Sequence, residues 1–344
     1  MKSFRERTRR SRLYHFRQLA QSALAAYGLA DANLSFIQYG ENITYRVDHP
    51  SARPGVPGES PYHPNRYLLR ILAMDDEQAT LSELTWLAAL HQEAGLPVPM
   101  PVAAPDGQLL LRIATPAIPQ GRVVSLMRWL DGQKIQKGLQ PHHLKALGQV
   151  VARLHNFSAT WQPPTGFDRP VWNWDNQLGG SCFDHPRADL IQSMPEPLRQ
   201  PFEEVSRSAW LVMEALGTGP DAFGLIHADL YPENVLYHNG AACPIDFEDG
   251  GYGYFMWDIA VALCTWAWQE GWERMRDAFR QGYSQYRAVP DEQWQYLDLF
   301  IATQFATMVL WASEFLQHDP ARSAEYIPWR DRNGQKLLEY LERG

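Results

Sequence analysis

The segment IHADLYPENVL, residues 226–236, combines a histidine, a carboxylate and an amide at short, fixed spacings. Asp229 follows His227 by two residues, and Asn234 follows Asp229 by five. A second carboxylate, Asp246, lies a short distance further along the chain, in the sequence PIDFED. Phosphoryl transfer from a nucleotide needs one carboxylate that accepts the proton of the attacking hydroxyl, and an amide and a further carboxylate that hold Mg²⁺ on the phosphates. The pattern therefore predicts a phosphotransferase site.

A tight hairpin is expected to position the two metal ligands. The sequence predicts short strands at Val235–Tyr237 and Ala242–Phe247, joined by an Asn-Gly turn at 239–240. Asn-Gly is a strong signal for a two-residue hairpin loop. Neighbouring strands would place Asn234 and Asp246 side by side, where they could share a metal ion.

Each of these polar residues also has a plainer interpretation. Asp229 and Asn234 could only cap turns, and Asp246 could only end a strand. His227 beside a carboxylate could be a metal pair, although no further His or Cys clusters nearby. The joint spacing, with apolar strands on both sides, favours the catalytic interpretation.

The same residues resemble the aminoglycoside phosphotransferase/choline kinase family, small-molecule relatives of the protein kinases. IHADLYPENVL resembles the catalytic loop of that family, PIDFED its metal-binding segment, and YGYFMWDIA at 252–260 the stretch that follows. The resemblance extends from about residue 34 to 270, and homoserine kinases and stress-response kinases are among the relatives. It implies that Asp229 is the catalytic base, that Asn234 and Asp246 bind Mg²⁺, and that His227 and Asp258 brace the loop.

The expected fold is α+β and bilobal, like that of a protein kinase. Residues 1–129 would form a nucleotide-binding lobe with a leading helix and a small antiparallel sheet, and residues 130–344 a larger, mainly helical lobe, with a hinge near 128–132. Helices are predicted at 16–27, 75–94, 144–154, 260–272, 294–315 and 333–342, and strands at 34–39, 43–47, 67–72, 108–113 and 122–130. Residues 48–66, with five prolines and two glycines, are predicted to be a surface loop.

The sequence evidence for the nucleotide-binding residues is weaker than that for the catalytic loop. Gly40 and Asn42 lie in YGENITYRV, where the family has a phosphate-covering hairpin, but a single glycine is also compatible with a plain β-turn. The family resemblance implies that Met127 and Trp129, near the hinge, contact the adenine of the nucleotide. The sequence alone indicates only a buried strand at these residues.

Arg70 stands where protein kinases carry a lysine. Its guanidinium can still neutralise phosphate. Glu83 lies on the apolar stripe of the following predicted helix and needs a cation, for which Arg70 is the natural partner. Glu77 is the competing partner, and Glu83 could also face solvent.

The acceptor side offers aromatic and acidic residues. The chain has thirteen tryptophans, and aromatic faces with acidic neighbours can hold an amine, although tryptophan at helical spacing more often packs a core. The candidate tryptophans are Trp172, Trp174, Trp257, Trp266, Trp268 and Trp272, and the candidate carboxylates, which could equally be solvated, are Asp175, Asp184, Glu248, Asp249 and Glu270. His142, His143 and His155 are predicted to lie at a helix surface or end, without a ligand role.

Composition sets the remaining expectations. The net charge of −8, from 31 basic and 39 acidic residues, argues against a nucleic-acid binder. Three cysteines without a CxxC pair suggest a reducing compartment. With neither a signal peptide nor an apolar run of about 20 residues recognised, we expect a cytoplasmic monomer or homodimer without a membrane partner.

The sequence thus predicts an ATP-dependent phosphotransferase that uses Mg²⁺ and acts on the hydroxyl of a small, amine-bearing molecule such as an aminoglycoside, choline or homoserine. GTP is not excluded as the nucleotide. The alternatives are a bacterial Ser/Thr protein kinase of the stress-response type and a non-catalytic nucleotide-binding module. The short segment between Asp246 and Asp258 argues against a long activation loop.

Overall fold

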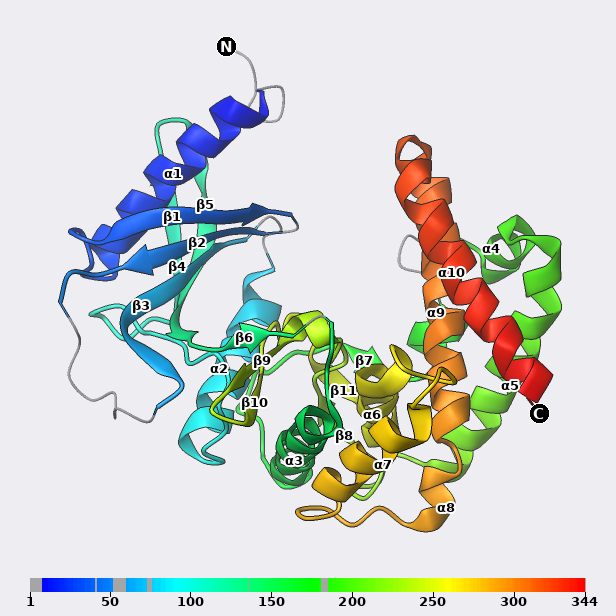
Figure 1. Cartoon of the computed structure of the whole chain (residues 1–344). Helices are drawn as coiled ribbons and strands as arrows, with labels where there is room; N and C mark the ends of the chain where they lie inside the picture. The colour runs from blue at the N-terminus through cyan, green and yellow to red at the C-terminus, as the bar shows by residue number, and fades with distance from the viewer. Residues whose placement is uncertain are drawn as a thin grey trace. The chain divides into compact units, whose positions relative to one another are not determined.

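A computed structural model describes residues 8–40, 42–51, 60–72, 76–135, 137–180 and 185–343, and Figure 1 traces the chain. Two compact units can be separated. Unit 1 comprises Met1–Gln133, Pro163–Asp168 and Leu236–Glu248; unit 2 comprises Lys134–Gln162, Arg169–Val235 and Asp249–Gly344. The functional boundary expected between residues 129 and 130 stays a prediction.

Unit 1 contains the predicted antiparallel sheet. Its five strands follow the order β1-β2-β3-β5-β4, and every neighbouring pair is antiparallel. The strands are β1 (Asn33–Tyr39), β2 (Ile43–Asp48), β3 (Tyr62–Ile71), β4 (Leu110–Thr115) and β5 (Ile118–Leu130). Alternation along β2 and β3 buries Tyr45, Val47, Tyr67 and Leu69, so these strands carry the core of the unit.

In the described part of unit 1, two helices pack in the unit. The helix α1 (Arg9–Ala26) begins at the N-cap Thr8, whose side chain accepts a hydrogen bond from the Ser11 amide, 3.3 Å away. Its apolar residues, Phe16 and Leu19 among them, recur every three or four positions and join the buried sheet residues in one core. The helix α2 (Glu77–Gln92) follows β3 and carries Glu83 on a buried face.

Unit 1 also contains most of the hairpin formed by β9 (Val235–His238) and β10 (Ala241–Pro244). The turn is confirmed: Asn239 and Gly240 have φ values of 48° and 80°, both in the left-handed region that the tight hairpin loop requires. Cys243 packs with Tyr62 and Leu130 in a second, smaller core.

Unit 2 is mainly helical. Its helices are α3 (Pro141–Ser158), α4 (Arg187–Ser193), α5 (Glu196–Leu216), α6 (Phe255–Cys264), α7 (Trp272–Tyr283), α8 (Asp291–Trp294), α9 (Leu297–His318) and α10 (Ser323–Arg343), with the short elements η1 (Asp175–Gly179), η2 (Pro232–Asn234) and η3 (Pro320–Arg322). A three-stranded sheet of order β7-β11-β8 comprises β7 (Val171–Trp172), β8 (Phe223–Ile226) and β11 (Gly251–Tyr254), and β6 spans Gln133–Lys134.

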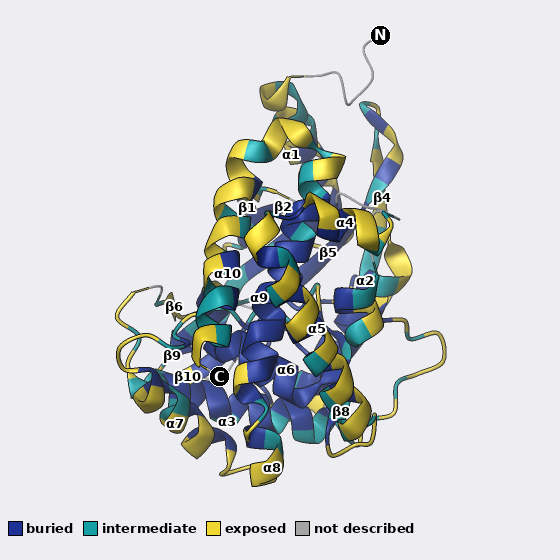
Figure 2. Cartoon of the chain, turned by 90° about the vertical axis from the view of Figure 1, so that its right-hand side faces the viewer, coloured by how far each residue is buried: buried dark blue, intermediate teal, exposed yellow. Residues whose placement is uncertain are grey.

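The helices α6 and α9 pack together at the centre of unit 2 and are buried along most of their length (Figure 2). This burial explains why both are apolar on every side. Among the described residues, the segment Asp291–His318 is long and apolar enough to cross a membrane, but 83% of its apolar window is buried inside the unit. The core helix of a soluble protein gives the same signal, so the segment is weak evidence for a membrane span.

Several predicted boundaries are wrong. The strand expected at 242–247 ends at Pro244, because proline cannot donate to a ladder and Asp246 has a φ of 67°. The helix expected at 260–272 is α6, which ends at Cys264, and Trp268 and Gly271 then adopt positive φ values before α7 begins.

Other elements are longer than, or shifted from, their predicted ranges. The strand β3 begins at Tyr62, inside the expected loop 48–66, of which residues 52–59 lie outside the described part. The helix α10 is about twice as long as the predicted 333–342, because Pro328 interrupts its sequence pattern without ending the helix. The helices α5 and α7 lie where no helix was predicted.

Candidate active site

The predicted catalytic loop follows β8 and is held by a buried carboxylate. Asp258 at the start of α6 accepts hydrogen bonds from the backbone N–H groups of His227, at 2.9 Å, and Ala228, at 2.7 Å. Ala228 has a φ of 67°, a strained conformation for an alanine. Both amides of this turn therefore point at one carboxylate, which fixes the position of the next residue, Asp229.

A second buried layer supports Asp258. The Nε2 atom of His155 on α3 lies 3.1 Å from a carboxylate oxygen of Asp258, and its Nδ1 atom lies 2.7 Å from the hydroxyl of Tyr283. Burial lowers the pKa of His155 more than the hydrogen bond to Asp258 raises it. The ring is therefore neutral, with Nε2–H donating to the carboxylate and Nδ1 accepting from Tyr283.

His155 lies in the last turn of α3, so the helix-end expectation is met, but its side chain is fully buried and not at the surface. Its charged and aromatic partners come from α6 and α7, more than 100 residues away in the chain. No local sequence pattern indicates such a contact.

Asp229 and Asn234 lie together. The Nδ2 group of Asn234 donates to the backbone oxygen of Asp229 at 3.0 Å and also to the Asp229 carboxylate. The short helix η2 makes this contact, because it turns the chain back after Tyr231. With its nitrogen engaged, Asn234 has its amide oxygen available for a cation.

Asp246 belongs to unit 1 and follows β10. Its side chain is exposed, and its positive φ turns the chain directly after the strand. Aspartate tolerates this conformation better than most residues. The conformation directs the segment 246–248 away from a regular strand, in contrast to the sequence prediction.

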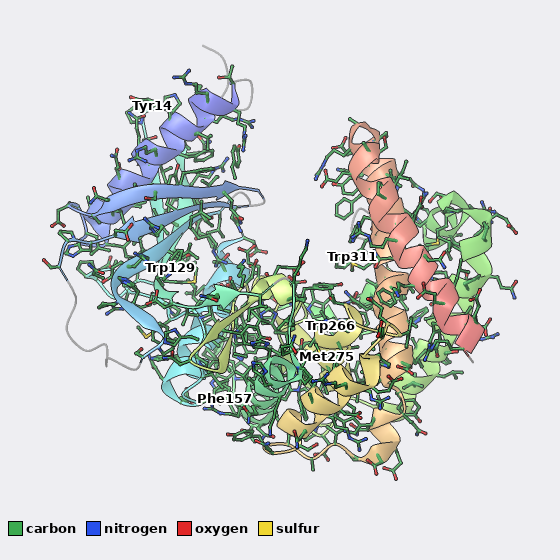
Figure 3. All side chains as sticks on the ribbon, viewed as in Figure 1. Tyr14, Trp129, Phe157, Trp266, Met275 and Trp311 are labelled. Atoms are coloured by element: carbon green, nitrogen blue, oxygen red, sulfur yellow. The ribbon has the colours of Figure 1, made fainter. Side chains whose placement is uncertain are left out.

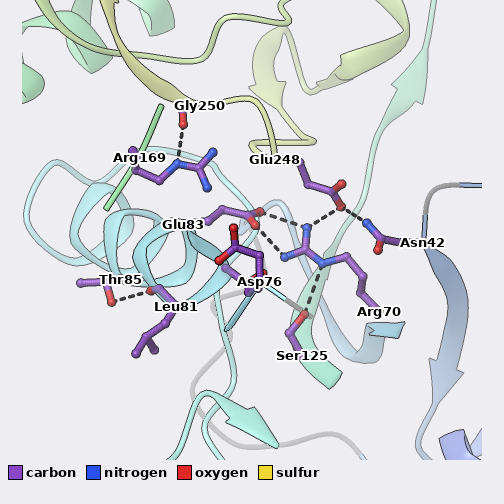
Figure 4. Close-up of polar contacts among 11 residues, drawn as sticks. Asn42, Arg70, Asp76, Leu81, Glu83, Thr85, Ser125, Arg169, Glu248 and Gly250 are labelled. Carbon is purple, nitrogen blue, oxygen red and sulfur yellow. Dashed lines mark hydrogen bonds and ion pairs between the residues drawn. The ribbon is translucent and has the colours of Figure 1, made fainter. Parts of the chain in front are cut away.

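Arg70 on β3 is the centre of a charged cluster in unit 1 (Figure 4). Its guanidinium binds both carboxylate oxygens of Glu83 at 3.1 and 2.7 Å, so the predicted ion pair is present. Its Nη1 atom also lies 2.8 Å from Glu248, whose same oxygen accepts a hydrogen bond from Asn42 at 2.6 Å.

Arg70 and Glu83 are buried, whereas the side chain of Glu248 is 33% exposed. Burial disfavours the charge of Arg70, but Glu83, Glu248 and Asp246 together raise its pKa above the ordinary value. The Arg70 guanidinium therefore stays protonated. The pairing of Glu248 with Arg70 was not predicted, since the two residues are 178 positions apart in the chain.

The other predicted nucleotide residues lie on the same sheet. Gly40 and Asn42 flank the turn between β1 and β2, where Glu41 is outside the described residues. Met127 on β5 is buried, and Trp129 on the same strand, labelled in Figure 3, is half-buried. The guanidinium of Arg66 lies over the ring of Trp129, 5.7 Å from its centroid. Their contact with adenine stays a prediction.

A cavity of about 600 Å³ opens within unit 2. Asp229 lines it, together with Glu233 of the same loop and Asp249. Its aromatic wall includes Trp172 and Trp311, whose ring centroids are 6.4 Å apart; Figure 3 marks Trp311 on α9. The volume is typical of a small-molecule site.

The helix α10 supplies the remaining wall of the cavity, with Trp329, Arg332, Asn333 and Lys336. Cys264 also lines it, but burial raises the pKa of its thiol to about 12, so the sulfur is not a nucleophile at neutral pH. The carboxylates of Asp229, Glu233 and Asp249 are therefore the groups in the cavity that can accept a proton at neutral pH.

Only some of the candidate acceptor residues line the cavity. Asp249, Trp172 and Trp257 line the cavity. Glu248 instead binds Arg70, and Asp184 lies outside the described residues. Asp175, Trp174, Trp266, Trp268, Glu270 and Trp272 do not line the cavity. The sequence did not reveal the contribution of α9 and α10.

Comparison with known proteins supports the phosphotransferase interpretation. Residues 45–294 match the profile of the Phosphotransferase enzyme family. The chain is 24% identical to an amicoumacin kinase of Bacillus subtilis (strain 168), over 75% of this chain and 70% of that protein. It is 26% identical to a homoserine kinase of Gluconobacter oxydans (strain 621H), over 65% of this chain and 68% of that protein.

A solved structure of a microcompartment-associated aminopropanol kinase superimposes with a TM-score of 0.75 and 26% identity, covering 95% of this chain and 98% of that chain. The fold is therefore that of the kinase-like phosphotransferases. The chain belongs to the Phosphotransferase enzyme family and is a small-molecule kinase with a hydroxyl acceptor.

Proposed function

We propose that this enzyme transfers the γ-phosphoryl group of ATP to the hydroxyl of a small, amine-bearing molecule bound in the unit 2 cavity. The observation that carries the proposal is Asp229, which lines that cavity while Asn234 holds its carboxylate. The acceptor oxygen forms a bond to the γ-phosphorus as the bond to the departing ADP oxygen breaks. The proton of the acceptor hydroxyl passes to Asp229.

Asn234 and Asp246 are the proposed Mg²⁺ ligands. Their donor set, an amide oxygen and a carboxylate, consists of the hard oxygen ligands that Mg²⁺ prefers, and the nitrogen of Asn234 is engaged with Asp229. A bound Mg²⁺ would neutralise charge on the nucleotide phosphates. Arg70 would add a fixed positive charge, with Glu83 and Glu248 holding its guanidinium.

Gly40, Asn42, Met127 and Trp129 complete the proposed nucleotide site. Gly40 has open space where a side chain would begin, so its backbone could approach a phosphate closely. The relatives support an amine-bearing acceptor, since aminopropanol and homoserine both carry an amine and a hydroxyl. We further propose that the enzyme acts in the cytoplasm.

The test is an acceptor screen with the purified protein and Mg·ATP, followed by ADP release. The first panel comprises aminoglycosides, choline, homoserine, hydroxylysine and methylthioribose. On any acceptor found, Asp229→Ala should lower kcat by about 10²–10⁴ and leave nucleotide affinity nearly unchanged. The exposed Asp277→Ala is the matched control, and unchanged turnover in Asp229→Ala would refute the assigned role of Asp229.

The protein-kinase alternative has little support from the segment that follows Asp246. After Glu248, the strand β11 and the first turn of α6 fill the chain as far as Asp258. No long loop lies there for regulatory phosphorylation. Phosphate incorporation into casein, without turnover of any small acceptor, would reverse this choice.

A further inference from the structure

The charges lining the cavity are divided between two parts of unit 2. Its carboxylates come from the loop residues Asp229 and Asp249 and from Glu233 of the short helix η2, whereas its cations come from α10. A substrate that is only cationic would match the loops but would be repelled by α10. The pocket is therefore built for a ligand with both signs of charge.

The cationic wall is one face of a helix. Trp329, Arg332, Asn333 and Lys336 follow the spacing i, i+3, i+4, i+7, which places them in one stripe along α10. Gly334, on the opposite side of the helix, is buried against Leu198 of α5. This contact fixes which face of α10 turns toward the cavity.

The two cationic side chains on this stripe, Arg332 and Lys336, differ in whether they already have an ion-pair partner. Lys336 is already bound to Glu339, with its Nζ 2.7 Å from a carboxylate oxygen. Arg332 makes no hydrogen bond or ion pair with any residue in the described ranges. Its neighbour Arg330 is paired with Asp331 at 2.9 Å and does not line the cavity. Arg332 is thus the cation that remains for a ligand.

A guanidinium presents a planar pair of donors that fits a carboxylate. We propose that the acceptor carries a carboxylate bound by Arg332, so that the substrate class is hydroxylated amino acids rather than amino alcohols. This inference rests on the proposed function, which places the acceptor in this cavity. The hydroxyl would face Asp229, and the ammonium would face the carboxylates of the loops.

The experiment compares hydroxy amino acids with their decarboxylated counterparts. The pairs are L-serine and ethanolamine, L-threonine and 1-aminopropan-2-ol, and L-homoserine and 3-aminopropan-1-ol, each differing by one carboxylate. Binding is measured by the fluorescence of the cavity tryptophans, separately from turnover. We expect at least one acid to bind at least about tenfold more tightly than its amine.

The variant Arg332→Gln should abolish that preference, because its affinity for the hydroxy amino acid should fall about tenfold or more while its affinity for the amine stays unchanged. Arg332→Lys should retain part of it, and Arg330→Gln, which removes the same charge from the same helix, should behave like the wild type. Equal or tighter binding of every amine, or an equal loss for acid and amine in Arg332→Gln, would overturn the proposal. An acid that binds through Arg332 but is never phosphorylated would overturn the proposed function instead.

Discussion

The carboxylate of Asp258 offers a direct test of how the catalytic loop is held. The substitution Asp258→Asn keeps the size of the side chain but removes its charge. It leaves one acceptor oxygen for three donors, namely two backbone N–H groups and the ring of His155. The new NH₂ group would face at least one of these donors.

The size of the effect follows from these contacts. A hydrogen bond to a charged group contributes about 1.5–3 kcal/mol, and breaking a buried charged contact costs about 3–5 kcal/mol. We expect Asp258→Asn to lower the free energy of unfolding by about 3–5 kcal/mol. Turnover should also fall under folded conditions, because the turn at Ala228 that positions Asp229 loses its anchor.

The assay is urea unfolding followed by tryptophan fluorescence, with turnover measured at urea concentrations where the variant is folded. Asp277→Asn is the control, since its carboxylate is 62% exposed and, within the described part of the chain, pairs only with the adjacent Arg276. That control should change the free energy of unfolding by less than about 1 kcal/mol. A similarly small loss in Asp258→Asn would refute the argument that this carboxylate holds the loop.

Two further predictions concern the packing and the pH dependence of unit 2. Gly282→Ala should lower the urea midpoint and reduce the free energy of unfolding by about 1–3 kcal/mol or more. The added Cβ would lie 1.9 Å from the backbone oxygen of Lys145 and would force α3 and α7 apart. The exposed Gln281→Ala is the control, and equal midpoints for the two variants would contradict the argument. The lowered pKa of His155 means that the unfolded chain binds a proton that the folded chain does not, so the free energy of unfolding should fall as the pH drops below about 6.5, by at most about 1.4 kcal/mol per pH unit. An NMR titration should show the His155 ring titrating below the ordinary histidine pKa of 6.5, and a midpoint at or above 6.5 would contradict the assignment.

The sequence by itself determined the features that depend on neighbours along the chain. The contact between Asp229 and Asn234 spans five residues, and one short helical turn makes it. The hairpin at residues 239–240 is equally local, because its two residues set the backbone angles of the turn. The sheet was predictable for the same reason, since alternation marks each strand separately.

The ion pair of Arg70 with Glu83 was also within reach of the sequence, because a carboxylate on an apolar helix face requires a cation and few candidates were near. The second partner of Arg70, Glu248, could not be predicted from the sequence, because the two residues are 178 positions apart and meet only in the folded chain.

Only the tertiary structure decided which side chains support the loop and line the cavity. His155 meets Asp258 across 103 residues, and Arg332 lines the same cavity as Asp229 from the last helix of the chain. The environment of a side chain depends on every element packed around it, whereas a sequence pattern reports only the face of its own helix or strand. For that reason the sequence predicts the reacting groups, and the packing of α9 and α10 defines the shape and charge of the cavity that Asp229 lines.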